Sequence, residues 1–428
     1  MVKDQTCIKI FYGLENIMSE SAFFTIVSNN YISQALVLFS SIKEHHPESK
    51  FYIFVSDGKN NDIPIKFDDQ LNYVFCEDIG IPNFLDMAFY YNCVEFNTSL
   101  KPFAFKHILN FKKFKNIFYL DPDIFLFDNL SLFETNLINH NIIITPHITA
   151  PTGPKSDQLF MRYGAYNLGF LAISDTMESH RFIKWWMDAT SVCCFDDKRL
   201  SLFVDQKWID LVPSLFAGVY IERHPGCNVA YWNLHERTTF KDPVSGRLLV
   251  NDGTPVIFFH FSSVTFDDPF AISYKFNEFN LIDRPELKSF FDEYKELLIQ
   301  SGFLETSKID HAFNSFEDGT AISSLLRRAY FEFCKKNGFS NNNPFNIGSH
   351  AYSLGVSLPI NGSDELFKYY NSNTVVKSDW KVRIVDAIIY SIFKLLGYKK
   401  SIALFKYLAN SSDLSGLAVL LVKYSKKS

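Results

Sequence analysis

The chain has 428 residues, 47% of them hydrophobic, which is enough for a large core and for two or three domains. A formal net charge of −5, with 21% charged residues, indicates neither a nucleic-acid groove nor an acidic tail. Seven scattered cysteines without a CxxC spacing, an N-terminus without a signal-peptide profile and the lack of an apolar run of about 18 residues predict a reduced, cytoplasmic protein without a membrane span.

The first predicted elements form a β-α-β unit. The apolar run SAFFTIVSN covers residues 21–29, and KFYIFVSDG covers residues 50–58. Between them, YISQALVLFSSIKEHHP carries apolar residues at helical spacing and ends at Pro47. Two strands joined by a helix run parallel, and ligands bind beyond the carboxyl ends of such strands. Polar residues that follow the strands are therefore the first candidates for a site.

Similar elements continue along the first 300 residues. Helical patterns are predicted at 101–114 and 178–190. Further strand-like runs are LNYVF (71–75), NIFYLD (116–121), NIIITP (141–146), GFLAIS (169–174) and PVIFFHF (255–261). The predicted fold class is therefore α/β, with parallel strands packed between helices.

The pattern changes near residue 304, and we predict a catalytic domain at 18–303 and a mainly helical accessory region at 304–428. Residues 380–424 carry apolar faces with interspersed lysines, namely Lys394, Lys399, Lys400, Lys406 and Lys423. Such helices can cover the catalytic domain, mediate self-association or make peripheral contact with a membrane. The sequence leaves these three roles open.

The stretch NIFYLDPDIFLF interrupts an apolar segment with two carboxylates, Asp121 and Asp123. Asp-Pro-Asp is ordinary turn chemistry, so a turn is one explanation. The other is a site for Mg²⁺ or Mn²⁺, because two close carboxylates repel each other and are costly to bury without a cation. The apolar strands on both sides favour the metal site. On this interpretation the site without metal stores like-charge repulsion.

YLDPDIFLF closely resembles the DxD motif of GT-A glycosyltransferases, especially retaining enzymes of the glycosyltransferase family 8 type. The resemblance extends over roughly residues 20–265, and DQKWIDLVPSLFAGVYIERHPGCNVAYWNLHER is similar to bacterial glycosyltransferases of surface-polysaccharide gene clusters. It implies a GT-A fold, which is a Rossmann-like mixed sheet flanked by helices. It also implies Mn²⁺ or Mg²⁺ bound by Asp121, Asp123 and a late histidine, His260 in FFHFSS.

The same resemblance nominates residues for a nucleotide-sugar donor. FTIVSNNYISQALVLFSSI is similar to the family's segment at the base, LKPFAFKHIL to the segment with a basic residue at the diphosphate, and YNLGFLAIS to the Asn-x-Gly strand at the sugar. The donor-binding residues implied are Asn29, Tyr31, Lys101 or Lys106, Asp121 and Asn167. FVDQKWID resembles the family's Asp-Gln segment, which implies catalytic roles for Asp205 and Gln206. The family's HxxGxxKPW pattern is not reproduced after His260, so phosphate contacts from that loop stay open.

The function expected from this resemblance is transfer of a sugar from a nucleoside-diphosphate sugar to a hydroxyl of a glycan or lipid-linked acceptor in bacterial polysaccharide biosynthesis. Retention is favoured over inversion, in which Asp205 would act as general base. A sugar nucleotidyltransferase would need a glycine-rich phosphate loop after the first strand, and TIVSNNYIS contains no glycine. A glycosidase needs two carboxyl groups about 5–10 Å apart on either side of the bond, which a converging pair does not provide. A sugar nucleotidyltransferase and a non-catalytic sugar-nucleotide-binding protein stay the alternatives.

Overall fold

The structure, a computed structural model, describes residues 21–60, 68–339 and 342–357, together with scattered positions between 388 and 419. By its contacts the chain divides into two compact units. The first takes in Met1–Ile81 and Val94–His311, and the second takes in Pro82–Cys93 and Ala312–Ser428. The internal segment Pro82–Cys93 thus belongs with the C-terminal part. The domain boundary at 303/304 stays a prediction.

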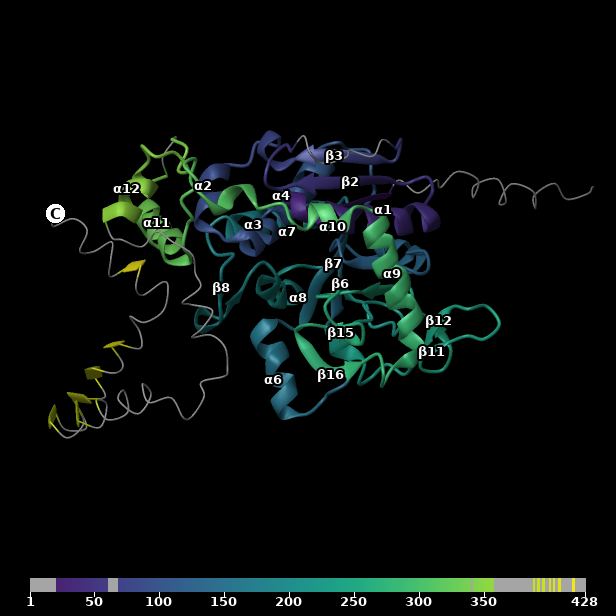
Figure 1. Cartoon of the computed structure of the whole chain (residues 1–428). Helices are drawn as coiled ribbons and strands as arrows, with labels where there is room; N and C mark the ends of the chain where they lie inside the picture. Colours follow the sequence, from purple (N-terminus) through teal and green to yellow (C-terminus); the bar gives the residue numbers. More distant parts are fainter. Residues whose placement is uncertain are drawn as a thin grey trace, which may run out of the picture. The chain divides into compact units, whose positions relative to one another are not determined.

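The first unit is built on a seven-stranded sheet in the order β10-β6-β7-β4-β1-β2-β3. Figure 1 labels β2, β3, β6 and β7 of this sheet. Its strands in chain order are β1 (Ser21–Val27), β2 (Lys50–Val55), β3 (Leu71–Phe75), β4 (Asn116–Leu120), β6 (Ile142–Pro146), β7 (Tyr166–Ser174) and β10 (Val219–Ile221). β1 pairs in parallel with β2 and β4, whereas β7 runs antiparallel to both of its neighbours, β4 and β6. The predicted β-α-β unit and the predicted α/β class with a mixed sheet are confirmed.

Helices and short strands complete the described part of the chain. The helices are α1 (Ile32–His45), α2 (Phe84–Tyr90), α3 (Cys93–Ser99), α4 (Lys101–Leu109), α5 (Ser131–Leu137), α6 (Pro154–Tyr163), α7 (Met177–Thr190), α8 (Val212–Leu215), α9 (Lys288–Gln300), α10 (Phe303–Thr306), α11 (Ser324–Asn337) and α12 (His350–Ser357). The short strands are β5 (Ile124–Leu126), β8 (Asp196–Asp197), β9 (Leu202–Phe203), β11 (Thr239–Lys241), β12 (Leu248–Val250), β13 (Thr254–Pro255), β14 (Phe258–His260), β15 (Ala271–Ser273) and β16 (Phe276–Asn280).

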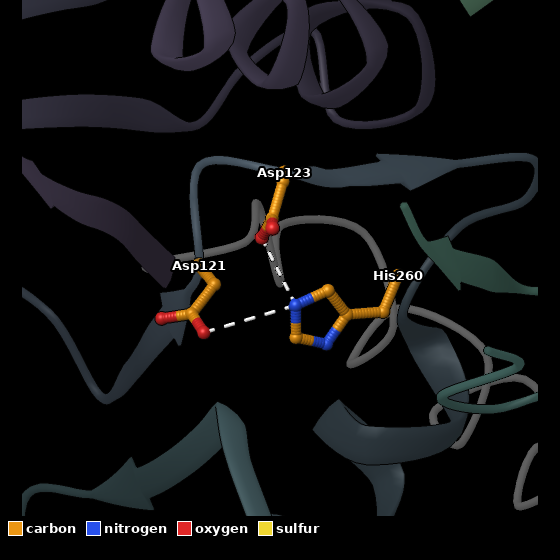
Figure 2. Close-up of side chains that lie close together, drawn as sticks. All are labelled: Asp121, Asp123 and His260. Atoms are coloured by element: carbon orange, nitrogen blue, oxygen red, sulfur yellow. Dashed lines mark ion pairs between the residues drawn. The ribbon is translucent and has the colours of Figure 1, made fainter. Parts of the chain in front are cut away.

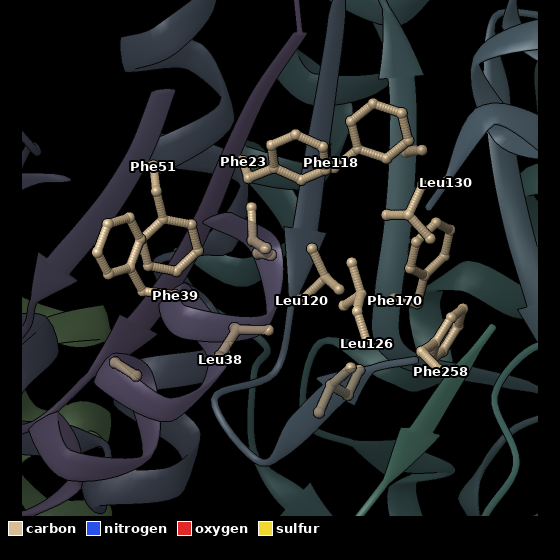
Figure 3. Close-up of a cluster of buried hydrophobic side chains, with 14 of the residues drawn as sticks. Phe23, Leu38, Phe39, Phe51, Phe118, Leu120, Leu126, Leu130, Phe170 and Phe258 are labelled. Carbon is tan, nitrogen blue, oxygen red and sulfur yellow. The ribbon is translucent and has the colours of Figure 1, made fainter. Parts of the chain in front are cut away.

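The central strands are buried on both faces, because alternate side chains point to opposite sides of a sheet and helices cover each side. On one side Phe23 and Phe118 stack with ring centroids 4.9 Å apart, in a core that also contains Leu38 of α1 (Figure 3). On the other side Phe24 packs edge-on against Phe105 of α4 at 4.7 Å. These strands therefore have continuous apolar sequences.

β5 and β14 form a separate antiparallel ribbon. Only three residues separate the end of β4 from the start of β5. Phe258 of β14 stacks on Phe170 of β7 at 5.2 Å, and Phe259 and Phe261 belong to a second core cluster that includes residues of α9. The ribbon is anchored on both faces, and this anchoring holds the turn between β4 and β5 in place.

Several sequence expectations differ from the structure. The helix predicted at 101–114 ends at Leu109, because Lys112 takes a left-handed conformation (φ 52°) in the following turn. PVIFFHF contributes the last residue of β13 and the whole of β14, and neither strand joins the central sheet. Most of residues 380–424, including Lys394, lies outside the described residues. Among the helices that are described, none combines the length and the apolarity that a membrane crossing requires.

Candidate active site

The Asp-Pro-Asp stretch is a turn that joins two buried strands. The Asp121 N–H donates to the Gly169 carbonyl (2.7 Å) and so extends the pairing of β4 with β7. The Ile124 N–H donates to the Asp121 carbonyl (3.1 Å) and closes the turn. Both aspartate side chains point toward the ring of His260 (Figure 2). The turn explanation and the site explanation are therefore compatible.

His260 reaches this turn through the pairing of β5 with β14. In that antiparallel register His260 lies opposite Ile124, and the Phe261 N–H donates to the Asp123 carbonyl (2.8 Å). The register of a two-stranded ribbon thus brings together residues that are far apart in the sequence.

The three side chains converge closely enough for one ion. The His260 Nε2 atom lies 2.9 Å from Oδ1 of Asp123 and 3.8 Å from Oδ2 of Asp121, and one ligand atom from each residue lies within 4.8 Å of the others. The Asp121 and Asp123 side chains are 28% and 23% exposed, whereas that of His260 is 4% exposed. The site is therefore open at its carboxylates, where oxygens of a ligand can approach.

This donor set fits a divalent cation. Carboxylate oxygens suit Mg²⁺ and Mn²⁺, and an imidazole ligand shifts the preference toward the transition metal. Burial opposes the charge of Asp123, but the neighbouring His260 outweighs burial and holds the pKa of Asp123 below its ordinary value. In the same way, Asp123 overcomes burial and raises the pKa of His260. The like-charge repulsion expected from the sequence is thus offset at Asp123 by His260.

Lys101 is the buried cation of the site. Its Nζ atom lies 3.1 Å from Asp205 and 3.6 Å from Oδ1 of Asp121, and it donates to the Leu168 carbonyl at 2.9 Å. The Tyr119 hydroxyl donates to the same Oδ1 of Asp121, and Lys101 lies 4.5 Å above the Tyr119 ring. Oδ1 of Asp121 thus faces Lys101 and Tyr119, while Oδ2 faces His260. Lys106 lies five residues further along the helix, about 140° around its axis, and hence on a different face.

Asp205 is almost fully buried, at 1% exposure of its side chain. Burial raises the pKa of Asp205 to about 6, because desolvation outweighs the attraction of Lys101. The residue before it, Val204, has a φ of 43°. A β-branched residue in the left-handed region costs about 1–3 kcal/mol, and such strain is concentrated at functional sites.

Gln206 lies beside the same stretch of β7. Its Oε1 accepts from the Leu168 N–H (2.9 Å), and its Nε2 donates to the Tyr163 carbonyl (3.0 Å). The Leu168 backbone therefore connects two site residues: its N–H donates to Gln206, and its carbonyl accepts from Lys101. Both ends of the Gln206 amide are held by the backbone.

A second group of residues lies at the carboxyl ends of β1 and β2. The Asn29 backbone N–H and its Nδ2 both donate to Oδ1 of Asp57, at 2.9 and 2.7 Å. Tyr31 follows in the next turn with 45% of its surface exposed. Asp57 is a site candidate that the sequence analysis did not name, although the polar end of KFYIFVSDG was a usable signal. Nothing in the sequence singles out Tyr119, because it is one of several aromatic residues in buried strands.

Asn167, in β7, contacts the metal-site histidine. Its Oδ1 lies 3.2 Å from Nδ1 of His260. The ring of Trp232 packs edge-on against His260 at 5.1 Å. The structure thus brings Asn167, Asp205, Gln206 and Lys101 around one turn, together with the three candidate metal ligands.

Comparisons with known proteins give similarity without a family assignment. No protein-family model matches the chain. Two uncharacterized proteins of Bacillus subtilis (strain 168), YfnF and YfnD, are each 26% identical to it. The match covers 69% of this chain and 97% of YfnF, and 71% of this chain and 95% of YfnD.

Several solved glycosyltransferase structures are similar to this chain. A galactosyltransferase, LgtC, determined with donor and acceptor sugar analogues, is 16% identical with a TM-score of 0.41, covering 65% of this chain and 95% of LgtC. The glycosyltransferase GlyE of Streptococcus pneumoniae TIGR4 is 16% identical with a TM-score of 0.38, covering 70% of this chain and 67% of GlyE. Identities of 16% with TM-scores of 0.41 and 0.38 assign no function to this chain.

Proposed function

We propose that this chain is a metal-dependent glycosyltransferase that moves a sugar from a nucleoside diphosphate to a hydroxyl of a glycan or lipid-linked acceptor in bacterial polysaccharide biosynthesis. The observation that carries the proposal is the convergence of Asp121, Asp123 and His260 at the carboxyl end of β4, where open α/β sheets bind ligands. These residues would hold Mn²⁺ or Mg²⁺. When bound, such an ion neutralises charge that develops on a diphosphate leaving group.

The remaining site residues have roles that suit this reaction. Lys101 keeps the carboxylates of Asp121 and Asp205 in place and balances their charge. Tyr31, which is 45% exposed, would stack on a nucleotide base, and Asn29, paired with Asp57, would contact an edge of that base. The contacts of these residues with the nucleotide base are part of the proposal.

Retention of configuration is the proposed stereochemical outcome. An inverting enzyme needs a general base that reaches the acceptor hydroxyl. Asp205 is buried and paired with Lys101, which speaks against that role. NMR assignment of the product anomer tests this point: a product of opposite configuration to the donor would contradict it.

The chemistry is tested with a panel of nucleotide-sugars, with release of nucleoside diphosphate as the measured quantity. Activity should require Mn²⁺ or Mg²⁺, should vanish with EDTA and should return when metal is added back. Asp123→Ala should abolish both metal binding and transfer. The matched control is Asp128→Ala, which removes a partly exposed carboxylate five residues further on, paired with Arg247, and should leave activity unchanged.

Three results would contradict the proposal. Full activity of the EDTA-stripped protein would exclude a metal-dependent reaction. Release of pyrophosphate in place of nucleoside diphosphate would indicate a nucleotidyltransferase. Donor binding without any release would indicate a non-catalytic binding protein.

We also infer a cytoplasmic location. This rests on the scattered cysteines of the sequence, which show no CxxC spacing. Peripheral contact of the helices predicted at 380–424 with the inner membrane face, or their self-association, stays part of the proposal. Co-sedimentation of the full chain with anionic liposomes tests the membrane contact.

A further inference from the structure

Asn167 lies between two histidine rings. Its Oδ1 lies 3.2 Å from Nδ1 of His260, and its Nδ2 lies 3.5 Å from Nε2 of His147. All three residues are buried. Buried polar groups are costly to leave without partners, so the amide and the two rings have to satisfy one another.

A histidine binds metal as the neutral ring, and in that form the orientation of the Asn167 amide decides which nitrogen of His260 carries the proton. When Oδ1 of Asn167 faces the ring, the hydrogen bond requires an N–H at Nδ1. The Nε2 atom, which faces Asp121 and Asp123, then offers its lone pair to a metal. If the amide were reversed, its NH₂ group would donate to Nδ1. The proton of a neutral ring would then sit on Nε2 and block coordination.

His147 supports the orientation that suits metal binding. Burial lowers the pKa of His147 to about 4, so the ring is neutral near pH 7 and keeps one nitrogen as an acceptor for the Asn167 NH₂ group. Asn233 donates to the His147 carbonyl at 3.1 Å, and the His147 ring packs edge-on against Trp232 at 5.6 Å. The acceptor is therefore held in place by its own neighbours.

Gly169, two residues after Asn167 in β7, provides the space for the His260 ring. A Cβ atom at this position would lie 2.4 Å from Cε1 and 2.8 Å from Nδ1 of His260. Any side chain would displace the ring from the aspartates or from Asn167. Trp232 contacts the same ring edge-on, so His260 is enclosed by Gly169, Asn167 and Trp232.

We propose that Asn167 is a positioning residue. It holds the His260 ring with the Nε2 lone pair directed at the metal, and His147 keeps the Asn167 amide in the orientation that this requires. The proposal rests on the metal-dependent function proposed above and deepens it. It differs from the donor-sugar contact predicted from the sequence, because both polar ends of the Asn167 amide already face histidines.

The test is Mn²⁺ binding to the full chain in the absence of any donor, measured by calorimetry and by the loss of the free-Mn²⁺ EPR signal. Asn167→Leu keeps the size of the side chain but removes the acceptor, and should weaken Mn²⁺ binding by about 10–100-fold. Asn167→Asp keeps an acceptor oxygen and should stay within a few-fold of the wild type. Asn72→Leu removes a half-buried amide of β3 that donates to the Phe51 carbonyl, and should leave Mn²⁺ affinity unchanged.

The outcomes separate this proposal from the function on which it rests. If Asp123→Ala loses Mn²⁺ binding while Asn167→Leu binds as the wild type does, the metal site stands and the positioning role is wrong. If the wild type binds no Mn²⁺, the metal site and the positioning role are both wrong. Thermal unfolding checks that the variants fold. Should Asn167→Leu fail to fold, Gly169→Ala replaces it, because its added methyl displaces the same ring; wild-type affinity in that variant would overturn the proposal.

Discussion

At the scale of single residues, the site depends on one buried lysine shared by two carboxylates. Lys101 is 3% exposed and lies within 4 Å of both Asp121 and Asp205. These carboxylates outweigh the effect of burial and raise the pKa of Lys101, so its charge is retained at neutral pH. Breaking a buried ion pair by removing one partner is much more costly than replacing the whole pair, because a charge is left without compensation.

We therefore expect Lys101→Met to lower the free energy of unfolding by about 3–5 kcal/mol. Lys106→Met, on a different face of the same helix, should change it by less than about 0.5 kcal/mol. Adding Asp205→Asn to Lys101→Met should recover part of the loss, since it removes one of the uncompensated charges. Urea unfolding of the four proteins measures these differences, and an equal loss from both lysine variants would contradict the buried-cation role.

At the scale of elements, a buried histidine joins the end of α1 to the start of α5. The His46 Nε2 atom accepts from the Leu130 N–H at 2.9 Å, and its ring lies 4.9 Å from that of Phe23. Burial, assisted by the nearby His45, lowers the pKa of His46 to about 4. The neutral ring is required here because a protonated Nε2 could not accept the hydrogen bond.

Part of the pH dependence of stability follows from this histidine, and His147, whose pKa burial also lowers to about 4, adds a similar part. Its folded pKa of about 4 lies below the unfolded value of about 6.5, so the unfolded state takes up the proton first on acidification. The stability that depends on the neutral His46 ring is present above about pH 6.5 and is lost as the pH falls from about 6.5 to about 4. At pH 5 the free energy of unfolding is lower by about 2 kcal/mol from this residue. His46→Gln should remove this part of the slope. His45→Gln should keep most of it, because burial contributes more than His45 to the lowered pKa of His46.

Urea unfolding at pH 7 and pH 5 measures the slope for the wild type and both variants. The comparison between proteins is needed because the raised pKa of Asp205 acts in the opposite direction and stabilises the fold on acidification. An unchanged slope in His46→Gln would show that this ring is not buried as a neutral group.

At the scale of the whole molecule, the second unit is assembled from two distant parts of the chain. Arg327 of α11 donates through Nη1 to the carbonyls of Phe89 (2.7 Å) and Tyr91 (3.0 Å), at the end of α2. Tyr330, one turn further along α11, donates to Asp86 at 2.6 Å. The last carbonyls of a helix have no partner within it, so the guanidinium satisfies groups that would otherwise be buried without hydrogen bonds.

Arg327→Met should therefore loosen α2 without disturbing the central sheet. Hydrogen exchange followed by mass spectrometry should show faster exchange in peptides covering 84–91 and 324–337, while peptides from β1 and β4 keep their protection. The matched control is Lys335→Met, which removes an exposed ion pair with Glu332 on the same helix and should leave exchange unchanged. Equal protection in Arg327→Met and wild type would show that the two segments do not depend on this contact.

Much of the site could be predicted from the sequence because its signals are local. The apolar runs around 21–29 and 50–58, with a helical pattern between them, are sufficient for a β-α-β unit, and side-chain periodicity reflects burial directly. The break at Asp121 and Asp123 is also local, since carboxylates inside an apolar segment require an explanation wherever they occur. His260 was nominated only through resemblance, because one histidine in an apolar run carries no signal of its own.

The sequence by itself therefore determined the α/β class and the interruption of an apolar segment by two candidate ligands, Asp121 and Asp123, whereas the third, His260, came from the resemblance to a family. The tertiary structure decided the antiparallel direction of β7, the register that sets His260 beside Asp123, the pairing of Asp57 with Asn29 and the choice of Lys101 as the buried cation. It also joined Pro82–Cys93 to the C-terminal unit. The physical reason is the same in each case: periodicity reports whether a residue is buried, whereas strand register and hydrogen-bond partners depend on chain segments that meet only in the fold.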